Sequence, residues 1–350
     1  MSGVRLFSEE IMRAVVLRKT GGPEVLTVTE TYEPRPGRGE VLVSVSSAGI
    51  NYAEILSRKG LYGWAPKRPY ILGMECSGVI EAVGEGVSSS RIGERVMAGA
   101  KHGCYAEKIA VPEASAVPVP AGYSMEEGAA FLVNYMTAWV CLFRMARLLA
   151  GEKLLVTAAA GGVGTAAVKL ASSAGAEVYG MAGSGEKCAL VESLGAARCF
   201  NYRSEDAFKE LLAATGGVDA VLEVVGGKVY KRSLDVLNPF GRVVVAGFAG
   251  LDLDKRNPVS WIRTWRDIPR ADVGMMAERS IGVMSSHLGY LLDREPGIMT
   301  EVYAALEKFV GEHNIRPVVG KVFPLEDASA AHEHVESRKS TGKVLLKVGG

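Results

Sequence analysis

The segment that most constrains the fold is KLLVTAAAGGVGTAAVKLASSAGAEV, residues 153–178. A short apolar run is followed by closely spaced glycines and then by a helical pattern of apolar residues, which predicts a strand, a tight turn and a helix in one βαβ unit. Glycines let such a turn approach a pyrophosphate, whose charge meets the N–H groups of the helix N-terminus. Glycine turns also occur for packing alone, but this context favours a dinucleotide site. The residues assigned to it are Ala160, Gly161, Gly162, Val163 and Gly164.

The centre of the chain alternates strand and helix patterns. Nearly continuous apolar runs lie at 153–159, 177–182, 198–202, 218–225 and 242–248. Helical patterns separate them at 165–175, 186–194, 204–214 and 228–237, and one more strand is expected at 279–286. Such runs are typical of a parallel sheet that is covered on both faces. The sequence therefore predicts an α/β domain with a doubly wound parallel sheet.

The flanking regions have a different pattern. Short strands with glycine and proline turns run from residue 12 to about 122, and the tail KVLLKV alternates in the same way. We therefore expect a β-rich domain over 12–126 that is completed by 288–350. The dinucleotide-binding domain is expected over 127–287, and 1–11 is expected to be a flexible extension.

Composition argues against several function classes. The chain carries 40 Lys and Arg against 39 Asp and Glu, so no overall charge favours nucleic acid. Its five Cys include no CxxC pair and its five His are scattered, which predicts neither a disulfide framework nor a metal site. No apolar stretch reaches the roughly 18 residues of a spanning helix. Because the N-terminus also lacks an apolar signal core, we expect a cytoplasmic protein.

The end of the second central strand bears on which dinucleotide is bound. An NAD site usually places an acid there for the ribose hydroxyls. The sequence GMAGSGEK has no carboxylate at 182–184, whereas Ser184 can donate to a 2′-phosphate and Lys187 can neutralise it. Glu186 argues against this interpretation, and Lys187 could merely solvate its helix. The residues favour NADPH over NADH.

Further motifs carry a family resemblance. In chain order they are AGINYAEI (48–55), GLY (60–62), GMECSGVIEAVGEGV (73–87), GERV (93–96), AAAGGVG (158–164), FNYR (200–203), HLGYL (287–291) and STGKVLL (340–346). Along nearly its whole length the chain resembles the zinc-free quinone oxidoreductase branch of the medium-chain dehydrogenase/reductase superfamily. FLVNYMTA (131–138), RTW (263–265) and HLGYL are most similar to the vesicle amine transport protein 1-like subgroup.

The resemblance implies a GroES-like β domain beside a Rossmann domain, with the active site between them. It places Asn51 and Thr137 near the nicotinamide, and Tyr62 in the lining of the site. By the same resemblance, the further cofactor-binding positions are Tyr202 beside the 2′-phosphate, Gly247, Phe248, His287 and Lys343. Each has a structural alternative: Tyr52, Tyr62 and Tyr202 could be packed aromatics, and Thr137 could bond back within its helix.

Departures from the zinc-dependent relatives imply chemistry without a metal. Asn51 stands where those relatives have a ligand Cys, and Met74–Glu75 where they have a His–Glu pair. The four-cysteine structural zinc lobe is missing as well. The implied function is hydride transfer from NADPH to a quinone or an α,β-unsaturated ketone or aldehyde. Asn51, Tyr52 or Tyr62 would donate a hydrogen bond to the substrate oxygen.

A function of another class stays open as the alternative: an NADPH-binding, membrane- or lipid-associated interaction protein with little turnover. It rests on a basic, aromatic region that could touch a surface. The residues of that region are Arg256, Trp261, Arg263, Trp265, Arg266 and Arg270. A connecting segment that covers the active site and a dimer interface would also account for these basic and aromatic residues. The resemblance also implies a homodimer that pairs through the strand near 279–286.

Overall fold

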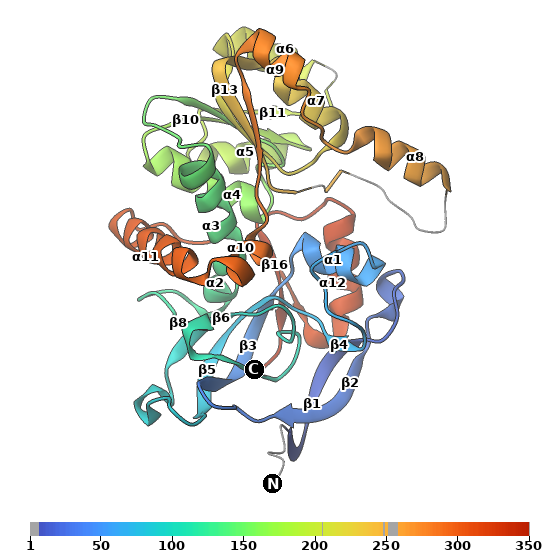
Figure 1. Cartoon of the computed structure of the whole chain (residues 1–350), viewed down its shortest axis with the longest axis vertical. Helices are drawn as coiled ribbons and strands as arrows, with labels where there is room; N and C mark the ends of the chain where they lie inside the picture. The colour runs from blue at the N-terminus through green and yellow to red at the C-terminus, as the bar shows by residue number, and fades with distance from the viewer. Residues whose placement is uncertain (1–6, 205, 248, 251–257, 350) are drawn as a thin grey trace. The chain divides into compact units, whose positions relative to one another are not determined.

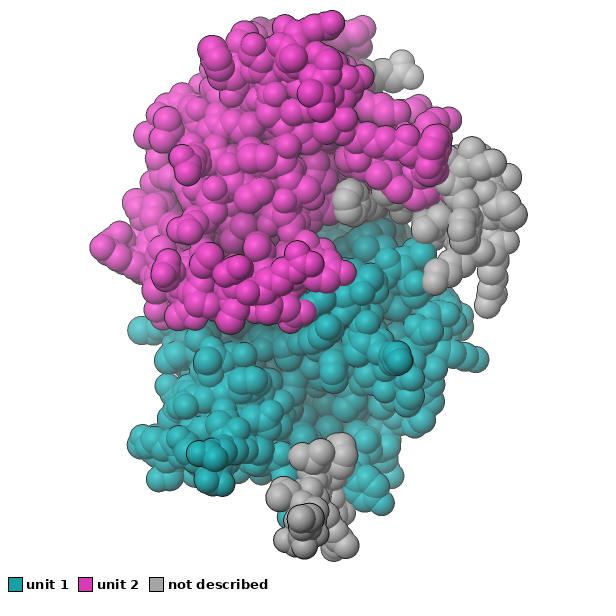
Figure 2. All heavy atoms as spheres, viewed as in Figure 1, with its two compact units in different colours: residues 1–133, 316–350 teal, residues 134–315 magenta. Residues whose placement is uncertain are grey.

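The computed structural model describes residues 7–204, 206–247, 249–250 and 258–349 (Figure 1). The chain forms two compact units (Figure 2). Unit 1 comprises Met1–Val133 and Arg316–Gly350, and unit 2 comprises Asn134–Ile315. The chain therefore leaves unit 1 once and returns to it, so that unit 1 is built from two separate stretches.

Unit 2 contains a six-stranded parallel sheet, which confirms the predicted fold class. Its strands are β9 (Lys153–Val156), β10 (Glu177–Ala182), β11 (Arg198–Asn201), β12 (Val218–Glu223), β13 (Leu237–Val245) and β14 (Gly282–Ser285). They lie in the order β11-β10-β9-β12-β13-β14. The order reverses between β9 and β12. In sheets of this kind, ligands bind at the carboxyl ends of the strands at this point.

Helices follow the strands of unit 2, as the alternating pattern predicts. They are α4 (Gly162–Ser173), α5 (Gly185–Ser193), α6 (Ala207–Thr215), α7 (Gly227–Asp235), α8 (Pro258–Asp267) and α9 (Val273–Arg279) (Figure 1). Buried side chains such as Phe200, Phe208 and Leu211 form the core between the sheet and helices of this unit. Burying such side chains gives roughly 1.5–3 kcal/mol each, which supplies the main driving force for the unit.

Residues 288–315, which the sequence led us to expect with the first domain, lie in unit 2. They form α10 (Leu288–Arg294) and α11 (Pro296–Glu312). The ring centroid of Phe309 on α11 lies 5.4 Å from that of Trp139 and 6.1 Å from that of Phe143. These aromatic contacts hold α11 against the segment formed by α3 (Leu132–Trp139) and the π-helical turn Val140–Met145.

Unit 1 contains a seven-stranded sheet and a three-stranded one. The larger sheet has the order β15-β16-β3-β5-β6-β8, with β7 also paired to β3. Its strands are β3 (Glu40–Gly49), β5 (Glu75–Val83), β6 (Arg95–Gly99), β7 (Lys108–Pro112), β8 (Ala116–Pro118), β15 (Val319–Pro324) and β16 (Lys343–Lys347). The smaller sheet contains β1 (Phe7–Leu17), β2 (Val28–Pro34) and β4 (Tyr70–Ile71). Strand β16 is antiparallel to β3, with Leu345 opposite Gly49. This pairing brings Lys343 to the end of β3.

Three helices accompany these sheets: α1 (Tyr52–Lys59), α2 (Met125–Ala129) and α12 (Ala328–Glu336). Short 3₁₀ turns lie at Pro23–Val25, Ser89–Arg91, Glu113–Ser115 and Leu325–Asp327. The core joins apolar residues of the β-strands, such as Val43 and Ile80, to Leu346 of the tail. Across the described ranges of the chain, no helix has both the length and the apolar character needed to cross a membrane.

Candidate functional site

The glycine turn between β9 and α4 is too tight for side chains. A Cβ on Gly164 would lie 2.5 Å from the carbonyl oxygen of Ala158, and a Cβ on Gly162 would lie 2.6 Å from Nδ2 of Asn134. Gly161 is the N-cap of α4, and no side chain caps the helix there. Gly161 has no side chain to occupy the N–H groups at the start of α4, and a helix N-terminus of this kind can bind an anion. This turn fits a pyrophosphate.

The ends of β9 and β12 are tied together where the strand order reverses. The backbone N–H of Thr157 donates to the carbonyl oxygen of Leu222 over 3.0 Å, and Oγ1 of Thr157 accepts from the N–H of Val224 over 3.0 Å. Oε1 of the buried Glu223 accepts from the N–H of Val225 over 2.8 Å. Burial raises the pKa of Glu223. These bonds fix the loop that borders the glycine turn on one side.

Glu223 was missed in the sequence because it interrupts an apolar strand without changing its pattern. The available signal was an acidic residue at the end of a buried strand, because a buried carboxyl must accept hydrogen bonds from nearby protein groups.

Gly247, an expected cofactor position, follows β13, and a Cβ there would lie 3.2 Å from the carbonyl oxygen of Val224. The loops after β12 and β13 thus lie against each other. Phe248 lies outside the described residues.

A basic group lies at the ends of β10 and β11. A Cβ on Gly183 would lie 2.7 Å from the hydroxyl oxygen of Tyr202, so the phenol rests on the backbone beside Ser184. Oγ of Ser184 accepts from the N–H of Lys187 over 3.3 Å and caps α5. Partial burial and the positive charge of Arg203 lower the pKa of Lys187. Two cations and a phenol therefore gather where the sequence predicts a phosphate group. Arg203 was missed, although it belongs to the FNYR motif.

Unit 1 contains a buried polar network around Asn51. Nζ of Lys343 donates to Oδ1 of Asn51 over 2.6 Å and to Oε1 of Glu75. Nδ2 of Asn51 donates to Oε1 of Glu75 over 3.1 Å and to Oε1 of Glu54 over 3.3 Å. An amide nitrogen carries two N–H groups. Both have acceptors within the protein, so Asn51 is a fixed group rather than a free donor.

The room for this network comes from Gly49 at the end of β3. A Cβ on Gly49 would lie 2.7 Å from Cε of Lys343, 2.8 Å from Cγ of Glu75 and 2.5 Å from the carbonyl oxygen of Ala129. The role of Glu54 was missed in the sequence. Its position three residues after Asn51 was a readable capping signal, and the N–H of Asn51 donates to Oε2 of Glu54 over 2.5 Å.

The other predicted site residues belong to both units. Tyr52 begins α1, and Tyr62 makes an edge contact with Trp64 at 6.4 Å between ring centroids. In unit 2, Thr137 lies on α3, the helix that brings Asn134 against the glycine turn. Nδ1 of His287 accepts from the N–H of Tyr290 over 3.3 Å and caps α10.

Part of the predicted basic, aromatic region can be located. Trp265 is 65% exposed, and the guanidinium carbon of Arg270 lies 4.0 Å from the centroid of its ring. Arg266 pairs with Asp267 over 3.1 Å. Arg256 lies outside the described residues, as do the side chains of Trp261 and Arg263.

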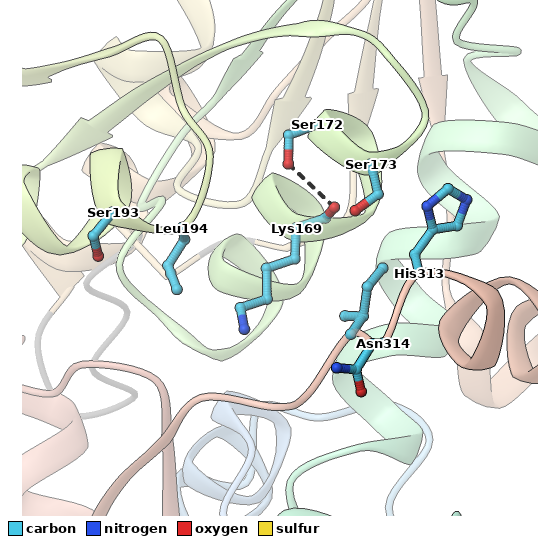
Figure 3. Close-up of a pocket in the computed structure, with 8 residues that line it drawn as sticks. Lys169, Ser172, Ser173, Ser193, Leu194, His313 and Asn314 are labelled. Carbon is cyan, nitrogen blue, oxygen red and sulfur yellow. Dashed lines mark hydrogen bonds between the residues drawn. The ribbon is translucent and has the colours of Figure 1, made fainter.

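A hollow of about 220 Å³ lies on unit 2, away from these groups (Figure 3). It is lined by Lys169, Ser172, Ser173, Ser193, Leu194, His313, Asn314 and Ile315. Oγ of Ser172 donates to the carbonyl oxygen of Lys169 over 3.2 Å, the dashed line in Figure 3. The hollow is at the C-terminal end of α4. The glycine turn is at the opposite end, about 18 Å away along a helix of 12 residues. The hollow is therefore separate from the predicted dinucleotide site.

Within the described ranges, no group of three or more His, Cys, Asp or Glu side chains is placed to hold a metal ion. Asn51 belongs to the network described above, and the N–H of Met74 joins it by donating to Oε1 of Glu54 over 2.9 Å.

Two family models match the chain. The alcohol dehydrogenase GroES-like domain matches residues 37–121, and a zinc-binding dehydrogenase model matches residues 194–346. The human synaptic vesicle membrane protein VAT-1 homolog is 35% identical over 97% of this chain and 87% of its own. The rat quinone oxidoreductase is 33% identical over 97% of this chain and 98% of its own.

Comparison with solved structures indicates the same family. The quinone oxidoreductase of Thermus thermophilus, whose structure was also solved in complex with NADPH, is 37% identical. Its TM-score is 0.80, and the match covers 96% of this chain and all 100% of that one. The glycine turn, the two-unit fold and these similarities lead to one assignment. The chain belongs to the medium-chain dehydrogenase/reductase superfamily, among the oxidoreductases that are similar to quinone oxidoreductase and the VAT-1 homologs.

Proposed function

We propose that the protein reduces a quinone or an α,β-unsaturated ketone or aldehyde with NADPH, and that it does so without a metal. The observation that carries this proposal is the combination of two anion sites in unit 2. One is the glycine turn with the N-terminus of α4, where the N-cap residue is Gly161. The other is the group formed by Lys187, Tyr202 and Arg203.

The second anion site supports NADPH over NADH. No carboxylate stands at 182–184, and Glu186 is exposed in the first turn of α5. Burial lowers the pKa of Lys187, and repulsion between its ammonium and the guanidinium of Arg203 lowers this pKa further. A 2′-phosphate between them would relieve this repulsion and accept charge-assisted hydrogen bonds. Ser184 already caps α5, so we assign it a supporting role in this site.

The chemistry divides between the cofactor and the side chains of unit 1. Bound NADPH would supply the hydride. The protein must then orient the substrate and stabilise the charge that develops on its oxygen. Because both N–H groups of Asn51 are bonded to carboxylates and its Oδ1 accepts from Nζ of Lys343, we assign it to positioning rather than to donation. We assign the hydrogen bond to the substrate oxygen to the phenols of Tyr52 or Tyr62.

The proposal of a reaction without a metal is supported by the donor chemistry around Asn51. An ammonium, that of Lys343, neutralises Glu75 at the place where the zinc-dependent relatives coordinate their ion. An amide and a thioether replace the thiolate and imidazole that zinc prefers. Activity should therefore survive exhaustive treatment with a chelator.

The test is a panel of quinones, enones and enals, with oxidation of NADPH followed by absorbance at fixed enzyme concentration. We expect turnover with at least one class and a loss in kcat/KM for NADPH of at least about tenfold in K187E, from the loss of one charged contact. K209E is the matched control, because Lys209 is 80% exposed and its ion pair is with Asp206, close by in sequence. No turnover with any class, or equal losses in both variants, would overturn the proposal.

The homodimer stays a prediction. Strand β14 forms one edge of the six-stranded sheet, which supports pairing with a second copy there.

The membrane alternative is supported by the exposed ring of Trp265 with Arg270 stacked on it. Co-sedimentation with anionic vesicles, compared between the native chain and R266E/R270E, tests it. Equal partitioning of the two proteins removes the alternative.

A further inference from the structure

Two of the five cysteines lie side by side in unit 2, between α5 and β11. Cys188 is near the start of α5, and Cys199 is on β11. A hydrogen bond joins their thiols. Both thiols are free, and the reaction proposed above uses neither of them. The pair is therefore available for chemistry of its own.

The packing around Gly180 on β10 brings the two thiols together. Gly180 pairs with Cys199 in the parallel register of β10 and β11. A Cβ on Gly180 would lie 3.2 Å from Sγ of Cys199 and 2.6 Å from Cγ1 of Val191, so these two side chains share the space beside the glycine. Val191 follows Cys188 by one turn on the buried face of α5. The next residue, Glu192, accepts from the N–H of Cys199 over 2.8 Å, so this side of α5 is held on β11.

Exposure separates this pair from the other thiols of the chain. Cys188 and Cys199 are each 8% exposed. Cys76 and Cys104 in unit 1 also share a hydrogen bond, but both are 0% exposed, as is Cys141. An oxidant must reach a thiol before the thiol reacts. Among the described residues, the pair between α5 and β11 is thus the one in which the thiols contact each other and also reach solvent.

We propose that Cys188 and Cys199 are a redox modification site, at which a hydroperoxide joins the two thiols in a disulfide that weakens the binding of NADPH. The disulfide follows from the packing of the two thiols. Its effect on NADPH rests on the proposed function, which places the 2′-phosphate beside Lys187. The thiols and this anion site both belong to unit 2.

Hydrogen peroxide balances the reaction. One thiol is first oxidised to a sulfenic acid: the O–O bond of the peroxide breaks, the sulfur gains a hydroxyl group, and one water leaves. The second sulfur then attacks the first, the S–S bond forms, and the hydroxyl group leaves with the proton of the second thiol as another water. Two thiols and one peroxide thus give one disulfide and two waters. A dithiol reductant reverses the change by thiol–disulfide exchange.

The disulfide would act on the group that we assign to the 2′-phosphate. Lys187 directly precedes Cys188, and Tyr202 and Arg203 follow β11, the strand of Cys199. Two sulfurs in a disulfide lie about 2.05 Å apart, closer than two thiols in contact, so α5 and β11 must shift toward each other. The side chains between α5 and β10 are already in close contact and cannot absorb this shift. The backbone that carries Lys187 therefore moves, and its ammonium no longer fits the phosphate.

The first test is oxidation of the native protein by hydrogen peroxide, followed by peptide mass spectrometry without a reductant. Because a basic residue precedes each of the two cysteines, trypsin places them in separate peptides, 188–198 and 199–203. We expect these peptides to be linked, at a mass lower by two hydrogens than their sum. The number of free thiols should fall from five to three. Cys76 and Cys104 should stay reduced, which makes that pair an internal control.

The second test is fluorescence titration of NADPH into the reduced, the oxidised and the re-reduced protein. We expect oxidation to lower the affinity by at least about threefold, because a charged contact is weakened, and a dithiol to restore it. C188S should keep its affinity after peroxide treatment. C141S is the matched control, because Cys141 is buried and its thiol hydrogen bonds to Ser286. It should lose affinity as the native chain does.

Five free thiols after peroxide treatment, a disulfide between other cysteines, or sulfinic acid in place of the disulfide would overturn the modification site. A disulfide between Cys188 and Cys199 with unchanged affinity for NADPH would overturn the effect on the cofactor. Should C188S fail to fold, the peptide map and the reversal by dithiol in the native chain decide. A reduced protein that binds no NADPH would contradict the proposed function, and the peptide map would still test the disulfide.

Discussion

The clearest single-residue consequence concerns Glu54 and pH. Its pKa is 4.5 in the unfolded chain and about 7 in the fold. Between these values the folded protein holds a proton that the unfolded chain lacks, so the stability that this group contributes is complete below pH 4.5 and is lost as the pH rises through 7. At about 1.4 kcal/mol per pKa unit, the loss is about 3 kcal/mol.

E54Q should therefore flatten the dependence of stability on pH. Urea unfolding at pH 5 and pH 8 should show that the native chain loses more free energy of unfolding than E54Q, by roughly the 3 kcal/mol of the shifted carboxyl. E127Q changes a partly exposed carboxylate in the first turn of α2 that is paired with Arg316. Its free energy of unfolding should depend on pH as that of the native chain does. Parallel pH profiles for the native chain and E54Q would contradict the assignment of the proton to Glu54.

Gly49 is a second residue with a definite cost of change. A methyl group there would approach a backbone oxygen at 2.5 Å and the stems of Lys343 and Glu75 at 2.7 and 2.8 Å. We expect G49A to lose about 1–3 kcal/mol in the free energy of unfolding, as overpacking does. G311A is the control: apart from the chain neighbours and nearby backbone of α11 itself, no atom of the described residues lies within 4 Å of the added methyl group. It should be neutral or slightly stabilising. Equal effects would contradict the packing described at Gly49.

At the scale of elements, the turn that opens α4 combines packing with binding. G164A would place a methyl group 2.5 Å from the oxygen of Ala158 and 2.7 Å from Cα of Ala159. We expect the turn to shift and NADPH affinity to fall by at least about tenfold, or 1.4 kcal/mol. Fluorescence titration of G164A against G311A measures the loss. Unchanged affinity in G164A would show that the turn does not bind the cofactor.

Some elements were predictable and others were not. The runs at 177–182 and 218–225 became β10 and β12 because parallel strands covered on both faces leave a continuous apolar signal. The apolar segment after residue 125 contains no proline that would predict where its helices end. It is divided into α2, α3 and a π-helical turn. Apolar side chains on every face leave no period from which such breaks can be read.

At the scale of the whole chain, sequence patterns identify the fold class but not the network around Asn51. Lys343 is 292 residues from Asn51, and the two meet because β16 pairs with β3. Periodicity says nothing about such long-range pairing, so only the family resemblance could indicate Lys343. Glu54 and Glu223 were missed for a related reason. An acid inside an apolar pattern is interpreted as exposed until its buried donors are known.

We propose that unit 2 holds NADPH through Lys187, Tyr202 and Arg203. The most direct test of this proposal is the shift in thermal unfolding temperature when NADPH or NADH is added at increasing concentration, since a ligand stabilises the folded state according to its affinity. We predict that NADPH raises the unfolding temperature at concentrations where NADH has no effect, and that K187E but not K209E removes this preference. Equal shifts with the two dinucleotides, or a larger shift with NADH, would contradict the assignment of the 2′-phosphate to these three residues.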